Sequence, residues 1–440
     1  MSHPPTTVLE KQAAAAAPVA IDARRVAFAS AIGTTIEWYD FFIYGTAAAT
    51  VFGPQFFPQV SELAGTLAAF ATFGIGFIAR PLGGVVMGHY GDRLGRKFML
   101  VWSLMLMGLS TLGIGLLPTY ASIGAWAPAL LVALRFVQGF ALGGEWGGAV
   151  LMSVEHAPQG KRGLFGSFVA LGLPIGIIAS NLVFLIASTA VAPEEFTAWA
   201  WRVPFVASFL LVAVGLWVRV GIAESPVFAT AMRGQAARRM PVVDVLKAHW
   251  PTVLAAAGTY ISISGLGYIV LVYFVTYATR QLKLPLPTTL ALVMSSAVVF
   301  AVSIVLFAHY SDRLGRRRVM TWGLGLLVLW SLIFFPLADT GSVALIALTL
   351  SGMLFLQGAY IGPQPAVFSE LFPTEVRYSG ASLSLTLGTL LGGAIAPSVA
   401  TALFGMTGTS RYITYYITAM SLLSFLCVFG LRETYRERLD

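Results

Sequence analysis

The chain has 440 residues, of which 57% are hydrophobic and only 10% are charged, and its formal net charge is +8. A soluble domain has about 25% charged residues, and a mean hydropathy of +0.81 excludes that class of protein. The single cysteine, Cys427, excludes an intrachain disulfide and gives no support for a zinc site or a cysteine nucleophile.

Twelve apolar runs follow one another along the chain. Each is close to the roughly 20 apolar residues that a helix needs to cross a bilayer. None alternates polar and apolar residues as a membrane-barrel strand does, so helices are predicted. The expected spans are residues 26–52, 63–88, 98–117, 126–152, 164–190, 200–221, 250–279, 287–309, 319–337, 342–368, 381–405 and 410–431.

A charged ten-residue segment occurs twice, each time between two apolar runs. Gly88-His-Tyr-Gly-Asp-Arg-Leu-Gly-Arg-Lys97 returns as Ala308-His-Tyr-Ser-Asp-Arg-Leu-Gly-Arg-Arg317, with seven of ten residues identical. Gln138-Gly139 likewise matches Gln357-Gly358. A repeat at half the chain length predicts two related halves of six helices each.

The polar segments predict topology and domain organisation. Lys and Arg gather on the side of the amino terminus, and this positive-inside bias places both termini in the cytoplasm and argues against a nucleic-acid partner. The first residues have no cleavable apolar core, so a disordered tail is expected rather than a signal peptide. The predicted divisions are a tail at 1–25, bundles at 26–221 and 250–431, a linker at 222–249 and a second tail at 432–440.

The repeated hairpin, of the form G-x-x-x-D-R-x-G-R-[KR], resembles the signature of the major facilitator superfamily. Ile36-Glu-Trp-Tyr-Asp-Phe41, Gln138-Gly-Phe-Ala-Leu-Gly-Gly-Glu145 and Phe372-Pro-Thr-Glu-Val-Arg377 are similar to segments of its metabolite:proton symporter family, nearest to the shikimate-type branch. The resemblance implies an all-α membrane protein with twelve helices in two pseudo-symmetric six-helix bundles. It also implies a monomeric carrier in a bacterial inner membrane.

Five charged side chains fall at membrane depth, away from the ends of the predicted spans, namely Glu37, Asp40, Arg80, Arg135 and Glu145. A charge at membrane depth costs roughly 2.5–3.5 kcal/mol and is a functional hypothesis by default. In related sugar:proton symporters an acid of the first helix faces an arginine of the fourth, so the resemblance implies that Asp40 and Arg135 form such a pair.

The expected role of this pair is proton coupling. Burial disfavours the carboxylate of Asp40, whereas a nearby guanidinium favours it, so movement of Arg135 would exchange an ion pair for a proton. Glu37 either shares this role or pairs with Arg80. For each of these residues the alternative is a static buried ion pair that sets helix packing.

Other polar residues are candidates for substrate binding. Arg80 and Arg135 can bind a carboxylate through two parallel hydrogen bonds. The second half offers Gln357, Tyr360 and Gln364, at spacings that predict one face of the tenth helix. Tyr260 is a further candidate for substrate binding, and Asn181 is a weaker one. The alternative role for these residues is hydrogen bonding between helices. Shikimate-type members have an Arg and a Glu in the seventh helix, which this chain lacks, so the substrate stays open.

The repeated hairpins are expected to form cytoplasmic gates. The carboxylates of Asp92 and Asp312 can meet the amino-terminal dipoles of the eleventh and fifth helices. Glu145 is expected to be a gate or a structural charge. The remaining predicted gate residues are Arg93, Arg96, Glu155, Arg162, Arg313, Arg316, Glu370 and Arg377.

The predicted function is import of a small polar metabolite, such as shikimate or a dicarboxylate, by proton symport. The expected partners are this substrate, protons and the lipid bilayer, with no cofactor, no metal and no enzymatic activity. The alternatives are a carrier of a zwitterionic osmolyte or amino acid, an uncoupled facilitator, a drug:proton antiporter and a membrane sensor.

Overall fold

The computed structural model describes residues 23–94, 96–155, 157–220, 245, 247–373 and 376–435. The predicted tail at 1–25 and the linker at 222–249 lie almost entirely outside these ranges. The side chains of four predicted gate residues, Asp92, Arg93, Arg96 and Glu145, also lie outside the described part.

Six spans are built from the first half of the chain. They are α2 (Ala23–Thr50), α4 (Glu62–Leu94), α5 (Arg96–Leu116), α7 (Trp126–Ala141) continued by η1 (Leu142–Gly144) and α8 (Glu145–Glu155), α9 (Arg162–Ala190), and η2 (Ala200–Arg202) continued by α11 (Val203–Val220). The short helices α3 (Phe52–Phe56), α6 (Tyr120–Ile123) and α10 (Pro193–Ala198) lie in the connections.

The second half of the chain forms six more spans. They are α14 (Trp250–Tyr268) continued by the π-helical turn η3 (Ile269–Tyr273) and α15 (Phe274–Arg280), α16 (Leu286–Leu314), α17 (Arg316–Ala338), α18 (Val343–Ile361) with α19 (Gln364–Glu370), α20 (Arg377–Gly392) with α21 (Ala396–Thr407), and α22 (Arg411–Gly430). Each of the twelve predicted spans overlaps one of these helices.

Within the described residues, nine helices are long and apolar enough to cross a membrane. The other three spans are weaker in hydropathy or shorter: α2 contains Glu37 and Asp40, and α5 and α7 contribute the apolar stretches Val101–Leu116 and Trp126–Ala141. The two acids of α2 therefore lower the hydropathy that favours its insertion into the membrane.

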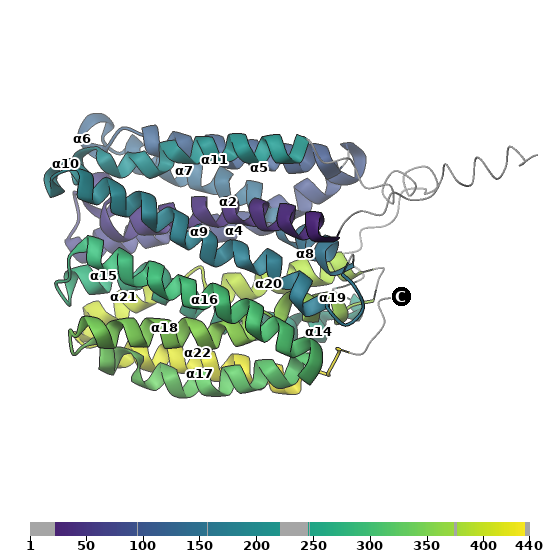
Figure 1. Ribbon diagram of the computed structural model, residues 1–440. Coiled ribbons are helices and arrows are strands. Elements are labelled where there is room, and N and C mark those ends of the chain that lie inside the picture. The colour runs from purple at the N-terminus through teal and green to yellow at the C-terminus, as the bar shows by residue number, and fades with distance from the viewer. Residues whose placement is uncertain are drawn as a thin grey trace, which may run out of the picture.

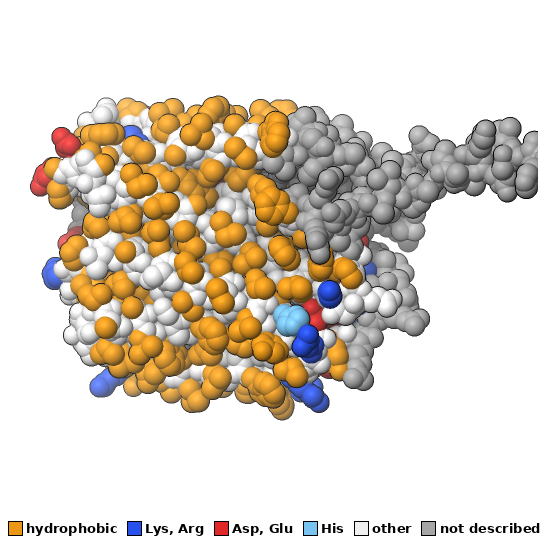
Figure 2. Space-filling view, in the orientation of Figure 1, with side chains coloured by type: hydrophobic (Ala, Val, Ile, Leu, Met, Phe, Trp, Pro, Cys, Tyr) orange, Lys and Arg blue, Asp and Glu red, His pale blue; other side chains and the backbone are white. Residues whose placement is uncertain are grey.

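The helices lie side by side in two bundles, one from each half of the chain (Figure 1). Helix α9 packs along α16 where the bundles meet, and α4 meets α20 and α21 there. Hydrophobic side chains cover the face shown in Figure 2, whereas charged side chains gather at the two ends of the helices. One end of the molecule contains the start of α2 and residue 435. We call it the latch end.

The tenth span is interrupted, which corrects one prediction. Helix α18 ends at Ile361 and α19 begins only at Gln364, because Pro363 lacks a backbone N–H group and cannot continue the hydrogen-bond ladder. The predicted continuous span at 342–368 is therefore two helices. Gly362 and Pro363 between them keep right-handed helical backbone angles, so the expectation that Gln357, Tyr360 and Gln364 share one face stays a prediction.

Close helix contacts depend on glycine. A Cβ atom placed on Gly139 of α7 would overlap the backbone of Gly76 on α4. Because both residues lack a side chain, the two backbones approach closely and bring Arg135 of α7 toward the first bundle's centre. Gly267 of α14 is also buried, but a Cβ there would meet nothing within 4 Å.

The variant Gly139→Ala is therefore expected to be less stable than wild type by roughly 1–3 kcal/mol, the usual cost of overpacking. The matched control Gly267→Ala should keep or slightly raise stability, because alanine favours helix by about 1 kcal/mol relative to glycine. Thermal unfolding of the purified proteins in detergent measures both. Equal unfolding temperatures for the two variants would contradict the packing argument.

Candidate functional site

A chain of hydrogen bonds connects Asp40 with Arg135. The hydroxyl of Thr111 on α5 lies 2.9 Å from Asp40 Oδ2, to which it can donate. Gln138 Nε2 donates to Thr111 Oγ1 at 2.8 Å, and Arg135 Nη1 donates to Gln138 Oε1 at 2.6 Å. Thr111 Oγ1 is also 2.9 Å from the carbonyl oxygen of Met107. Its single proton serves one acceptor at a time, so Asp40 can gain or lose this bond without a helix movement.

This geometry corrects the predicted direct ion pair. Among the described residues, no ion pair joins Asp40 to Arg135, although both side chains are 1% exposed. The guanidinium of Arg135 instead lies against aromatic rings, with its Cζ atom 4.7 Å from the ring centroid of Phe41, 4.1 Å from Tyr44 and 5.0 Å from Phe73. The rings of Phe41, Tyr44 and Phe73 therefore hold the guanidinium of Arg135 without a direct ion pair to Asp40.

Arg135 is a buried cation with unused donors. Its Nε and Nη2 atoms have no hydrogen-bond partner in the described structure. Cation–π contacts recover part of the cost of burial, but the charge has no carboxylate within ion-pairing distance among the described residues. A ligand carboxylate would supply both the missing charge and the missing acceptors.

Arg80 forms a second cationic centre next to the first. Its Nη2 atom lies 3.8 Å from Glu37 Oε1, which is the pairing considered for Glu37 from the sequence. Its Cζ atom is 5.2 Å from the ring centroids of Phe41 and Phe77. The ring of Phe41 is therefore shared by the guanidinium groups of Arg80 and Arg135.

A small cavity opens beside Arg80, where the two bundles meet. Its volume is about 30 Å³, and its lining includes Glu37 and Arg80 from the first bundle and Tyr260, Thr386 and Thr389 from the second. This space suits a water molecule and not a metabolite. Polar groups of both bundles line this small space.

The remaining predicted binding residues differ in position. Tyr260 lines the cavity, whereas Gln357, Tyr360 and Gln364 are buried but are not among its lining residues. The Gln357 and Gln364 Nε2 atoms and the Tyr360 hydroxyl have no hydrogen-bond partner in the described part of the chain. Asn181 Oδ1 accepts a hydrogen bond from Thr46 at 3.4 Å, and so links α9 to α2 as the alternative reading expected.

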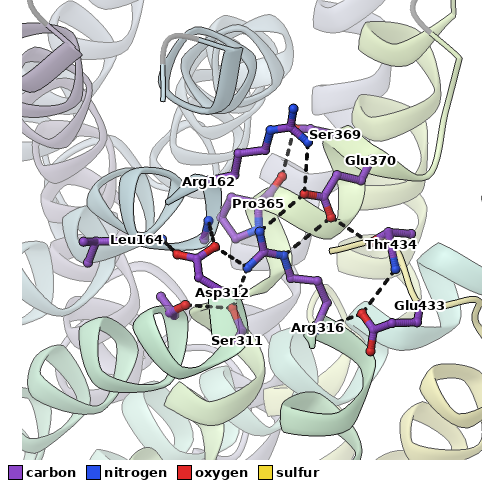
Figure 3. Close-up of polar contacts among 12 residues, drawn as sticks. Arg162, Leu164, Ser311, Asp312, Arg316, Pro365, Ser369, Glu370, Glu433 and Thr434 are labelled. Carbon is purple, nitrogen blue, oxygen red and sulfur yellow. Dashed lines mark hydrogen bonds and ion pairs between the residues drawn. The ribbon is translucent and has the colours of Figure 1, made fainter. Parts of the chain in front are cut away.

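At the latch end, Asp312 holds the start of α9 across the boundary between the bundles (Figure 3). The backbone N–H groups of Gly163 and Leu164 donate to Asp312 Oδ1 and Oδ2 at 2.9 and 3.0 Å. Arg316 Nη1 lies 2.6 Å from Oδ1 of the same carboxylate. The carboxylate thus meets the positive end of a helix dipole and a guanidinium together.

Glu370 is the second anchor of this network. Its carboxylate lies 3.4 Å from Arg316 Nη2 and 3.9 Å from Arg162 Nη1 of the first bundle, and it accepts a 2.7 Å hydrogen bond from the Thr434 hydroxyl (Figure 3). Nearby, Arg377 Nη1 lies 3.5 Å from Glu155 Oε1, again between the bundles. Arg313 is exposed and forms no ion pair with another described residue. The gating role of these contacts is a proposal.

The sequence analysis did not predict that Glu433 and Thr434 take part in the latch. Glu433 Oε1 accepts a 2.7 Å hydrogen bond from the backbone N–H of Arg316, the first residue of α17. Glu433 and Thr434 thereby tie the end of the chain into the network around Arg316 and Glu370.

Sequence reasoning also missed contacts at the opposite end. Arg280 of α15 lies 3.0 Å from Glu62 Oε1 and donates to Thr66 Oγ1 at 2.7 Å, both on α4. The Thr276 hydroxyl donates to the carbonyl oxygen of Ala49 on α2 at 3.0 Å. The two bundles therefore have polar contacts with each other at both ends of the helices.

Comparison with known proteins identifies the family. The sequence matches the Major Facilitator Superfamily over residues 30–397. The chain belongs to this superfamily. This member is 43% identical over 422 residues to the inner membrane metabolite transport protein YhjE of Escherichia coli, covering 94% of this chain and 95% of that protein. It is 40% identical over 419 residues to the shikimate transporter of the same organism, again covering 94% and 95%.

Solved structures agree with the superfamily fold. The crystal structure of a D-xylose-proton symporter superposes with a TM-score of 0.73 at 18% identity, covering 95% of this chain and 99% of that one. At this identity the likeness shows the fold alone. The twelve-helix prediction and the resemblance to metabolite carriers of the superfamily are confirmed, and the chain is a multi-pass membrane transporter rather than an enzyme.

Replacing Asp312 by asparagine should weaken the latch. The variant loses the ion pair to Arg316 and one of two acceptors for the α9 N–H groups, and hydrogen bonds to charged groups are worth about 1.5–3 kcal/mol. The fraction of molecules open at the latch end should rise roughly tenfold or more. Spin labels on exposed Gln159 and Ala248, in a background with Cys427 replaced by alanine, measure this opening as a distance distribution.

Lys161→Gln is the matched control for this experiment. Lys161 is exposed and directly precedes α9, so its loss should leave the distance distribution as in wild type. If Asp312→Asn gave the same distribution as Lys161→Gln, Asp312 would not hold the bundles together.

Proposed function

We propose that the protein imports a small organic acid by proton symport across a bacterial inner membrane, as a monomer with both termini in the cytoplasm. Relatives at 40–43% identity that are named as metabolite and shikimate transport proteins support this substrate class. The clustering of Lys and Arg on the side of the termini supports the orientation. The substrate and the coupling ion are inferred from the buried charges.

The observation that carries the proposal is the unsatisfied guanidinium of Arg135. A buried charge without a partner is strongly destabilising, and removing one partner of a buried pair costs about 3–5 kcal/mol. Arg135 has two nitrogen atoms without acceptors and only an amide oxygen as a partner. A substrate carboxylate fits this requirement better than a neutral sugar does, because it brings both acceptor atoms and an opposite charge.

The relay from Arg135 to Asp40 provides the route of coupling. A carboxylate bound to Arg135 would compete with Gln138 for the guanidinium, and Gln138 is the residue that donates to Thr111. Thr111 can turn from Asp40 to the Met107 carbonyl without leaving its position. Asp40 would then lose a hydrogen bond that stabilises its carboxylate and take up the transported proton.

Alternating access would exchange the closures at the two ends. The latch around Asp312 and Glu370 would open toward the cytoplasm, and the Arg280–Glu62 contact would open toward the outside. Bundles that rock about a midplane site expose that site to one side at a time. The 30 Å³ cavity beside Arg80 is the closed form of this site in the proposed cycle.

Asp40→Asn tests the proton role. The variant cannot bind and release a proton, so it should lose accumulation driven by a pH gradient in proteoliposomes while it keeps part of its substrate exchange. The exposed-acid control Glu195→Gln should accumulate substrate as wild type does. The probe is shikimate or another acid selected by a thermal-shift screen of organic acids, amino acids, betaines and sugars. Full gradient-driven accumulation by Asp40→Asn would exclude Asp40 as the proton carrier.

Arg135→Lys tests the anion role. Lysine keeps the positive charge but loses the planar guanidinium fork, so KM for an acid substrate should rise about tenfold, whereas Arg135→Gln should raise it further. The control ligand is the methyl ester of the same acid, which lacks the carboxylate. The ratio of acid to ester affinity should fall in both variants. A ratio that stayed at the wild-type value would show that Arg135 does not bind the carboxylate.

A further inference from the structure

A hollow of about 360 Å³ lies at the latch end on the side of the second bundle, apart from the central site. It is formed by the first turns of α17 and the last turn of α22. The residues that matter here are Arg317, Arg318, Thr321, Trp322, Phe429 and Glu433. None of them is a predicted substrate, proton or gate residue.

The two arginines give the hollow a positive charge that no ion pair among the described residues neutralises. Neither Arg317 nor Arg318 forms an ion pair within the described part of the chain. The only acid in the wall, Glu433, is already used, because it accepts backbone hydrogen bonds from Arg316 at 2.7 Å and Arg317 at 3.1 Å at the start of α17. The Glu433 carboxylate therefore bonds to the backbone at the start of α17 and forms no ion pair with the guanidinium groups of Arg317 and Arg318 in the described structure.

The side chains of α17 determine which donors face the hollow. Besides the two arginines, Thr321 lines the hollow, but its hydroxyl oxygen is shielded from solvent and points away from the open space. Thr321 follows Arg317 by four residues and Arg318 by three, so the three side chains share one face of α17. The Arg317 guanidinium is held with its Cζ atom 5.1 Å above the ring of Phe429. Two guanidinium groups at one hollow match the acceptor oxygens of a phosphate group.

The remaining wall is apolar and faces outward. Trp322 is 62% exposed and Phe429 is 57% exposed, and both lie on spanning helices that are covered with hydrophobic side chains. Aromatic residues at the end of a span lie at the level of the lipid headgroups. A polar pocket with an open apolar side fits a molecule that has a charged head and apolar chains.

We propose that this hollow binds the phosphate headgroup of an anionic phospholipid, with its acyl chains along Trp322 and Phe429. Basic pockets at the ends of spanning helices bind such headgroups, and each Lys or Arg near the membrane surface contributes about 1 kcal/mol. A soluble phosphate compound shares the headgroup chemistry, but it makes no use of the two exposed aromatic side chains.

Native mass spectrometry and thermal unfolding of the full-length protein in detergent test the proposal. Phosphatidylglycerol should bind and raise the unfolding temperature, whereas phosphatidylcholine and glycerol 1-phosphate at equal concentration should not. The double variant Arg317→Gln/Arg318→Gln should bind phosphatidylglycerol roughly 10- to 30-fold more weakly. Arg318→Gln alone, at an exposed position, should weaken binding about fivefold.

The control Lys283→Gln/Arg411→Gln removes two exposed positive charges at the opposite end of the molecule, and it should bind phosphatidylglycerol as wild type does. Equal weakening in the control and in the Arg317/Arg318 variant would show a general charge effect and overturn the site. Unchanged binding by Arg318→Gln and the double variant would overturn it as well. Stabilisation by glycerol 1-phosphate equal to that by phosphatidylglycerol would overturn the lipid assignment in favour of a soluble phosphate.

Discussion

The structure is organised around a buried guanidinium group that no described carboxylate neutralises. Arg135 is 1% exposed, stacks on three aromatic rings and donates to one amide oxygen, and no carboxylate within the described chain lies at ion-pairing distance. Burying such a charge is costly unless a partner arrives. The surrounding rings and the relay to Asp40 are best understood as a frame that holds this charge ready for an anion.

The two arginines of the centre differ in how far the protein satisfies them. Arg80 has an acid of its own in Glu37 and lines the small cavity, whereas Arg135 has only a relay of neutral groups between itself and Asp40. A relay of neutral groups can be rearranged at lower cost than a direct ion pair, because no charge has to be separated. In the proposed cycle, this difference would allow substrate binding at Arg135 to change the hydrogen bonding of Asp40.

The ends of the transporter are closed by different chemistry. At the latch end, buried carboxylates meet a helix amino terminus and guanidinium groups, and the chain's final described residues join the same network. At the opposite end, the Arg280–Glu62 pair involves an acid whose side chain is 79% exposed. Exposed ion pairs are worth at most about 1 kcal/mol, so the latch is the stronger of the two charge contacts.

The sequence by itself determined the twelve spans, the duplication of the halves and the set of charges inside the membrane, because insertion depends on local hydropathy and the repeat is visible in the residues. It did not determine which charges meet. Thr111, an ordinary polar residue by sequence, joins Asp40 to Gln138, and Glu433 meets the backbone N–H of Arg316 at the start of α17. Such contacts depend on the rotation and depth of each helix against its neighbours. Long-range packing sets these, as between Gly76 and Gly139, and only the tertiary structure shows it.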